Sequence, residues 1–186
     1  MKRFVLLHLF AFFSTIAYAQ VTWTGGGGNS DWHTGANWSS GLVPDASTDV
    51  LLNNSTVTGS YPVQVNSTAA VRTLTITPTL PNNITLLIPI TNLDPVSLQT
   101  FGTGIGSAII LNSGAIFQNQ SGVTSGTNIV LSDSIRVNNG GRYTHATRAM
   151  NSPIVNKLAF GPGTERGVFR YANYPLLSPT PGRGQE

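Results

Sequence analysis

Carboxylates come first among the groups that could do chemistry, because hydrolysis of a glycosidic bond needs two carboxyl groups flanking that bond. The chain has 7 Asp and Glu residues, and only Asp45 and Asp49 are near neighbours in the sequence. Asp45 follows a Val-Pro pair, and Asp49 precedes the apolar run VLL. Such positions are typical of a turn aspartate and of a residue that caps the entry to a strand. The sequence therefore favours structural roles for both and predicts no catalytic residue.

A basic cluster near the C-terminus could bind an anionic group. Arg136 and Arg142 flank the sequence VNNGG, and His145 and Arg148 follow shortly after. If VNNGG is a turn between two strands, both arginines can lie on one side of the fold, and guanidinium groups bind anions well. Polysaccharide lyases built on β-helices use basic residues in similar places, which makes Arg136, Arg142 and His145 candidate ligand-binding residues. The alternative, which we favour, is an ordinary solvated surface.

All three tryptophans of the chain, Trp23, Trp32 and Trp38, lie within the glycine-rich segment 21–48. Aromatic rings in such a loop could bind sugars, since binding residues often lie on exposed loops. Large side chains ahead of the first regular strand could instead cover the open end of a stack of coils. Their place at the start of the chain favours the cap, and the sugar-binding alternative stays open.

The sequence indicates no metal or cofactor site. Asn29 and Asp31 offer oxygen atoms of the kind that calcium prefers, but the ligand spacing of a calcium loop is absent. His33 and His145 are far apart and there is no cysteine, so no zinc-ligand pattern occurs. The sequence GTGIGS (102–107) begins like a dinucleotide-binding loop, but a serine stands where the third glycine belongs.

The N-terminus has the organisation of a secretory signal peptide. Two basic residues precede the apolar run 4–13, and residues 17–19 (AYA) form a cleavage signal. The apolar run is shorter than the roughly 20 residues of a membrane-spanning helix. We expect residues 1–19 to be removed before Gln20, and the protein to be secreted to the cell surface or the extracellular space.

The net charge argues against a nucleic-acid partner. Loss of Lys2 and Arg3 lowers the formal net charge from +3 to +1. Proteins that bind nucleic acid need a strong positive field. The remaining basic residues are unevenly placed, because residues 135–186 carry six arginines and one lysine against two glutamates.

Short alternating stretches rich in β-branched residues predict an all-β protein. Only 9% of the residues are charged, whereas helical surfaces are typically built from Glu and Lys. Beyond residue 19 no stretch has the apolar period of an amphipathic helix. The expected strands are 50–54, 61–65, 71–77, 84–88, 107–112, 115–119, 128–132, 135–139 and 142–145, with one further strand pair at 153–170.

An internal repeat favours a solenoid over a β-sandwich. The sequence LNSGAIFQN (111–119) aligns with VNNGGRYTH (137–145) at an offset of 26 residues. Periods of about 20 to 50 residues are typical of repeat architectures. We expect a right-handed parallel β-helix fragment with a cap segment at 20–48, coils at 49–170 and a disordered proline-rich tail at 171–186. The asparagines at the strand ends could form ladders between coils, and a β-sandwich is the alternative fold.

Two stretches resemble secreted bacterial surface proteins. The first contains a W-x-G pattern, further tryptophans, a Val-Pro pair and an aspartate before a valine. Its matching residues are Trp23, Gly25, Trp32, Asn37, Trp38, Gly41, Val43, Pro44, Asp49 and Val50. The second, residues 132–171, is similar to a segment of exported proteins of Gram-negative bacteria that use type IX secretion. The resemblance implies parallel β-helix coils and a place at the cell surface.

The function that these observations favour is a secreted, non-catalytic structural or adhesive module of a bacterial cell-surface protein. One alternative is a carbohydrate-binding module that uses the three tryptophans. Another is a polysaccharide-degrading β-helix enzyme. The expected partners are a surface or extracellular polysaccharide and a second copy bound through an open end of the solenoid, where unpaired strand edges favour association.

Overall fold

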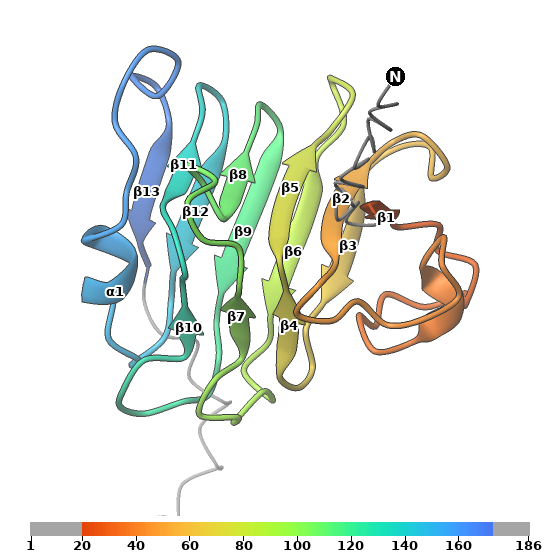
Figure 1. Ribbon diagram of the computed structural model, residues 1–186, viewed down its shortest axis with the longest axis horizontal. Coiled ribbons are helices and arrows are strands. Elements are labelled where there is room, and N and C mark those ends of the chain that lie inside the picture. Colours follow the sequence, from red (N-terminus) through yellow and green to blue (C-terminus); the bar gives the residue numbers. More distant parts are fainter. Residues whose placement is uncertain (1–19, 173–186) are drawn as a thin grey trace, which may run out of the picture.

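The computed structural model describes residues 20–172, which form a β-solenoid of about six coils (Figure 1). The predicted signal peptide lies outside the described residues, as does the predicted tail beyond residue 172. Nearly all regular structure is parallel β-sheet, so the predicted parallel β-helix is confirmed. None of the described residues belongs to a helix that is long and apolar enough to span a membrane.

Each coil contributes strands to up to three sheets. The first sheet contains, in spatial order, β1 (Gln20–Thr22), β2 (Asp49–Asn53), β5 (Thr73–Thr77), β8 (Ile109–Leu111) and β11 (Ile135–Val137). The second sheet contains β4 (Ala69–Val71), β7 (Leu98–Thr100) and β10 (Ile129–Val130). The third contains β3 (Tyr61–Gln64), β6 (Ile84–Ile88), β9 (Ala115–Asn119), β12 (Arg142–His145) and β13 (Val168–Tyr171). Two short helices, η1 (Gly35–Asn37) and α1 (Ser152–Val155), lie near the two ends of the stack.

The strand register confirms the repeat found in the sequence. β11 pairs with β8 so that Val137 lies opposite Leu111, and β12 pairs with β9 so that Arg142 lies opposite Ile116. Both pairs are separated by 26 residues, which is the offset of the sequence alignment. Every pairing between two of the strands β1–β13 is parallel, whereas sandwich hairpins are antiparallel. The β-sandwich alternative is therefore wrong.

Alternation of apolar and polar residues places the core inside the coils. In β5, Leu74 and Ile76 are fully buried, and the three threonines that alternate with them point outwards. A column of rings also runs through the third sheet, where the Tyr143 ring lies 5.2 Å from Phe117 and 5.0 Å from Phe169. Burial of a large apolar side chain contributes about 1.5–3 kcal/mol to stability. Burial of these side chains between the sheets therefore contributes much of the stability of the stack.

The strands largely follow the predicted stretches, with three differences. The stretch 71–77 is divided at Arg72, where the chain turns from the second sheet into the first. Strands β1 and β7, of 3 residues each, lie outside the predicted stretches. The strand pair expected at 153–170 is wrong in its first half. The helix α1 begins there at Ser152, with Pro153 in its first turn, where proline is tolerated.

The cap segment contains more regular structure than its glycine-rich sequence suggests. It begins with β1, which pairs with β2, and Figure 1 shows the rest of the segment at one end of the stack, beside β2 and β3. At the other end, β13 runs to Tyr171, one residue into the predicted tail. The described coils thus begin at Gln20 and include Tyr171.

Candidate functional site

The three tryptophans form one buried cluster. Trp23, Trp32 and Trp38 are 2%, 0% and 2% exposed. The Trp38 ring packs nearly edge-on against both others, at 5.0 Å from Trp23 and 4.7 Å from Trp32. Its indole Nε1 donates a hydrogen bond of 2.7 Å to the Trp32 carbonyl oxygen. No ring keeps a free face on which a sugar could stack, so the geometry favours the cap over the sugar-binding platform.

Asn37 holds the loop around this cluster together. Its side chain is fully buried, and its Nδ2 donates to Asn29 Oδ1 at 2.8 Å and to the Asp31 carbonyl oxygen at 2.9 Å. Its Oδ1 accepts from the Gly27 N–H at 2.9 Å. A side chain at Gly27 would meet Asn37 and Thr34 at less than 3 Å, which explains a glycine at this point of the run.

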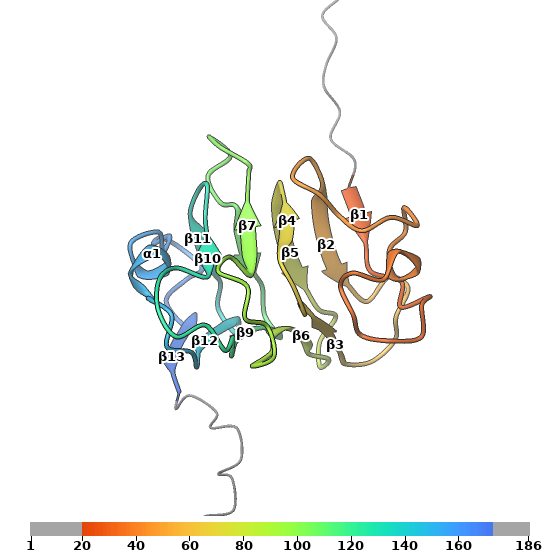
Figure 2. The same ribbon diagram turned by 90° about the horizontal axis from the view of Figure 1, so that it is seen from below.

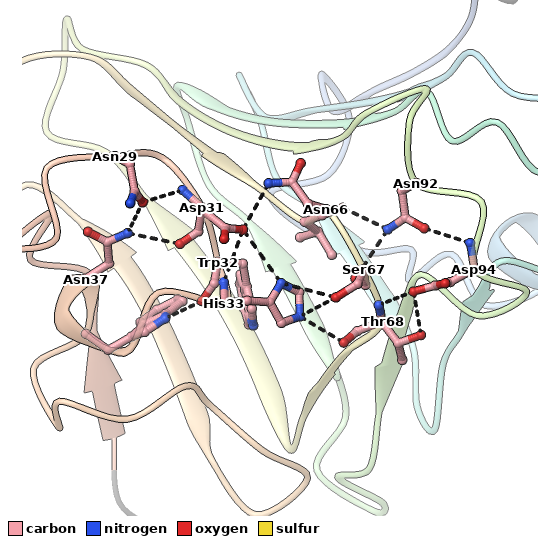
Figure 3. A network of polar contacts seen from close by, with 12 residues as sticks. Asn29, Asp31, Trp32, His33, Asn37, Asn66, Ser67, Thr68, Asn92 and Asp94 are labelled. Atoms are coloured by element: carbon pink, nitrogen blue, oxygen red, sulfur yellow. Dashed lines mark hydrogen bonds and ion pairs between the residues drawn. The ribbon is translucent and has the colours of Figure 1, made fainter.

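A chain of polar contacts runs from the cap segment into the second and third coils (Figure 3). Asp31 Oδ1 accepts from Asn66 Nδ2 at 3.0 Å, and the His33 ring contacts Ser67 and the Thr68 carbonyl oxygen. Thr68 donates to Asp94 Oδ2 from its backbone N–H at 2.6 Å and from its hydroxyl at 3.2 Å. The network therefore links three successive turns of the solenoid.

Asp31, His33 and Ser67 have the residue types of a hydrolase triad, but their geometry does not fit that role. The Ser67 hydroxyl lies 3.1 Å from His33 Nε2, as a nucleophile would. The Thr68 carbonyl oxygen lies 3.0 Å from the same nitrogen, and a nitrogen that donates there has no lone pair for the serine proton. Asp31 Oδ1 is 3.7 Å from Nδ1, beyond hydrogen-bond distance. When Nε2 donates to Thr68, these contacts link the cap segment to the coil and leave Ser67 without a base.

The three predicted basic ligand-binding residues do not lie together. Arg136 is on β11 in the first sheet, where its guanidinium bonds to Asn138 and to the Pro162 carbonyl oxygen. Arg142 is on β12 in the third sheet, because VNNGG is a corner between two sheets rather than a hairpin turn. His145 is 5% exposed and points inwards.

Both ring nitrogens of His145 make contacts inside the protein. Its Nε2 lies 2.9 Å from the Ala149 carbonyl oxygen and its Nδ1 lies 3.1 Å from the Tyr143 hydroxyl. Burial lowers the pKa of His145 below its ordinary value, although the bond to Ala149 opposes this effect. The ring is thus part of the core and cannot reach an external ligand.

Asp45 and Asp49 have the structural roles that the sequence favours. Asp45 Oδ1 accepts hydrogen bonds from the Ser47 N–H and hydroxyl and from the Thr48 hydroxyl, and these bonds lower the pKa of Asp45. Asp49 forms an ion pair with Arg72 and accepts a 2.5 Å hydrogen bond from the Thr73 hydroxyl in the next coil. Both carboxylates are thus taken up by contacts with neighbouring residues of the protein.

The other candidate ligand loops are also occupied by internal contacts. Asn29 Oδ1 accepts from the Asp31 N–H and from Asn37, so it belongs to the cap loop. In the sequence GTGIGS, the backbone N–H groups of Ile105 and Gly106 donate to Asp133 Oδ2 at 3.1 Å each. Within residues 20–172 no group of three or more His, Cys, Asp or Glu side chains could hold a metal ion.

Comparisons of the chain with protein-family models, with curated proteins and with solved structures found no match in any of the three. Inferences about function therefore rest on the sequence and on the geometry of the residues.

Several residues of these networks carried no signal in the sequence. Ser67 and Thr68 contact His33, Asn66 contacts Asp31, and Asp94 contacts Thr68. These contacts form only because stacking brings residues of successive coils side by side (Figure 3). The number of residues per coil differs between coils, so the sequence alone does not show which of these residues will lie side by side. The one available signal was the spacing of 26 residues between Thr68 and Asp94, which equals the offset of the visible repeat.

Proposed function

We propose that this protein is a secreted, non-catalytic structural or adhesive module of a bacterial cell-surface protein. The proposal is supported mainly by the hydrogen bonds of the polar side chains along the edges of the coils. They bond to the neighbouring coil and so hold the stack together. Secretion enters the proposal through the signal-peptide pattern of residues 1–19, and the cell surface through the resemblance of the two stretches described above.

Polar ties between coils recur along the described solenoid. Asn138 Nδ2 donates to Asn112 Oδ1 at 2.7 Å, and the Ser121 and Thr147 hydroxyls lie 3.0 Å apart. Lys157 Nζ donates to the Leu131 carbonyl oxygen. Each of these pairs spans 26 residues, which is one coil. A hydrogen bond of this kind contributes about 1 kcal/mol, so the set makes a substantial contribution to stability.

The carboxylates support the same function. Within residues 20–172, each Asp and Glu side chain accepts hydrogen bonds from the protein itself. Hydrogen bonds from backbone N–H groups lower the pKa of Asp133 and of Glu165. A carboxylate held ionised in this way is poorly suited to act as a general acid. This is why the polysaccharide-degrading alternative is the weaker proposal.

Self-association through an open end of the solenoid remains part of the proposal. β13 is the edge strand of the third sheet among the described residues, and Val168 and Tyr171 on it are exposed. Exposed strand edges pair readily with other chains.

The test is an assay for cleavage of polysaccharides. The purified protein is incubated with acidic and neutral polysaccharides, and new reducing ends and unsaturated uronates are measured. We expect no release above the level of heat-denatured protein, while Asp94→Asn lowers the thermal stability. Cleavage that disappears in Asp94→Asn or in Asp49→Asn, with the fold retained, would contradict the proposal and favour the enzyme.

A further inference from the structure

Two hollows that share Asn83 lie along the third sheet, and together they are called the groove. One hollow of about 340 Å³ is lined by residues that include Asn83, Ile116, Arg142 and Arg170. A second hollow of about 210 Å³ shares Asn83 and continues to Ser60 and Thr85. Figure 2 shows β3, β6, β9, β12 and β13 following one another along the stack, and the two hollows together touch all of these strands. Four spacings between parallel strands give a length of about 19 Å, enough for a short oligosaccharide.

Two arginines lie at the C-terminal end of this groove. Arg142 lies opposite Val168 in the strand register, and Arg170 is two residues further along β13, so both point to the same face of the sheet. Both line the same hollow. Diagonal neighbours of this kind are about 7–8 Å apart, close enough for two guanidinium groups to act on one ligand.

Neither guanidinium is used by the fold. Among the described residues, no hydrogen bond or ion pair involves the side chain of Arg142 or of Arg170. Arg136 and Lys157 differ in this respect, because both bond to backbone carbonyl oxygens of a neighbouring coil. The groove arginines are therefore available to a ligand.

The rest of the groove is uncharged. The hollow around Ser60 and Thr85 offers hydroxyl and amide groups, and no carboxylate lines either hollow. The binding surface thus combines a neutral, hydrogen-bonding stretch with two cations at one end. Guanidinium groups bind carboxylates through paired hydrogen bonds, and hydroxyl and amide side chains suit a hydroxyl-rich chain.

We infer that this groove binds an anionic polysaccharide that bears uronic acids, with uronate carboxylates on Arg142 and Arg170 and neighbouring sugars along Asn83 and Thr85. Nucleic acid fits less well, because it carries a charge about every 3.4 Å of each strand and would meet cations at one end only. The inference rests on the proposed function and specifies the polysaccharide to which an adhesive module would bind.

Binding of polygalacturonate, of its methyl ester and of dextran to the purified protein tests the inference by calorimetry. The ester keeps the sugar backbone but removes the negative charges. We expect saturable binding of polygalacturonate, with the ester and dextran bound about tenfold more weakly or not at all. The double variant R142Q/R170Q should lose about tenfold or more in affinity, since charge-assisted bonds are among the stronger polar contacts.

The matched control is R166Q, which removes the same charge from the turn before β13, at a residue that does not line either hollow. We expect its affinity to stay within about twofold of the unchanged protein. The melting temperature of R142Q/R170Q should match the parent, because neither side chain holds the fold.

Four results would overturn the inference: no binding of polygalacturonate, equal binding of the ester, an equal loss in R166Q, or tighter binding of DNA. Any of them leaves the structural function standing, whereas cleavage of polygalacturonate would overturn the proposed function itself.

Discussion

At the scale of single residues, the buried amide of Asn37 shows how a polar side chain can organise an apolar end of the molecule. Its side chain forms hydrogen bonds with Gly27, Asn29 and Asp31 at once, directly beside the tryptophan cluster. Asn37 and Trp38 also belong to the stretch that resembles secreted surface proteins. The residue types at this end of the fold could therefore be predicted, but the hydrogen bonds could not, because a loop without periodicity gives no rule for which groups meet.

Replacing Asn37 by alanine should destabilise the protein by about 2–4 kcal/mol. The substitution leaves buried polar groups of the cap loop unpaired, and each costs about 1–3 kcal/mol. Urea unfolding followed by tryptophan emission measures the change. Asn156→Ala, at an exposed position, should change the free energy of unfolding by less than about 0.5 kcal/mol. Equal stability of the two variants would contradict this role for Asn37.

His145 should make stability depend on pH. Burial lowers its pKa in the folded protein below the ordinary value of 6.5, so the unfolded chain takes up the proton first as the pH falls. Stability is therefore unaffected well above pH 6.5 and falls as the pH drops below 6.5. His145→Gln should lose this part of the dependence, and the difference between the two stability curves from pH 7.5 to 5 isolates it. Curves of identical shape would show that His145 does not carry the effect.

The sequence alone is enough to predict that Arg142 and His145 face opposite sides of their strand. They are three residues apart in a predicted strand, so alternation places them on opposite faces. Arg142 faces outwards and His145 faces the core, as alternation requires. The different sheets of Arg136 and Arg142 could not be predicted, since the sequence VNNGG suits a hairpin turn as well as a solenoid corner.

At the scale of the elements, the strands could be predicted best where they are long and alternate regularly. β6, β9 and β12 have the predicted bounds, and each alternates between buried and outward positions at its start. β7, with 3 residues, lies outside the predicted stretches, and of the predicted stretch 128–132 only 2 residues form β10. Their positions are set by pairing with the adjacent coils.

The asparagine ladder between β8 and β11 should contribute measurably to the contact between coils. Asn112→Ala, Asn138→Ala and the double variant form a cycle whose coupling energy should be about 1 kcal/mol. The cycle is needed because Asn138 also accepts a hydrogen bond from Arg136. A parallel cycle of Asn112→Ala with Asn156→Ala should give no coupling. A coupling energy near zero in the first cycle would mean that the hydrogen bond between Asn112 and Asn138 is a consequence of coil packing and adds no stability.

At the scale of the whole molecule, unequal coils explain why only one repeat is visible in the sequence. Along the first sheet, Leu74 follows Val50 by 24 residues, Ile109 follows Leu74 by 35, and Ile135 follows Ile109 by 26. Loops of different length leave the sheets in register, because each strand aligns by its own pairing. The fold class could thus be predicted from a single repeat, whereas the alignment of the other coils required the structure.

The most direct test of the account is the emission of the three tryptophans in the purified protein. We predict blue-shifted emission that shifts to the red in one cooperative urea transition and does not respond to neutral or acidic polysaccharides, because the rings are buried in the capped end of the solenoid. Red-shifted emission of the native protein, or a saturable response to a polysaccharide that persists in R142Q/R170Q, would contradict the cap and would favour a sugar-binding site at Trp23, Trp32 and Trp38.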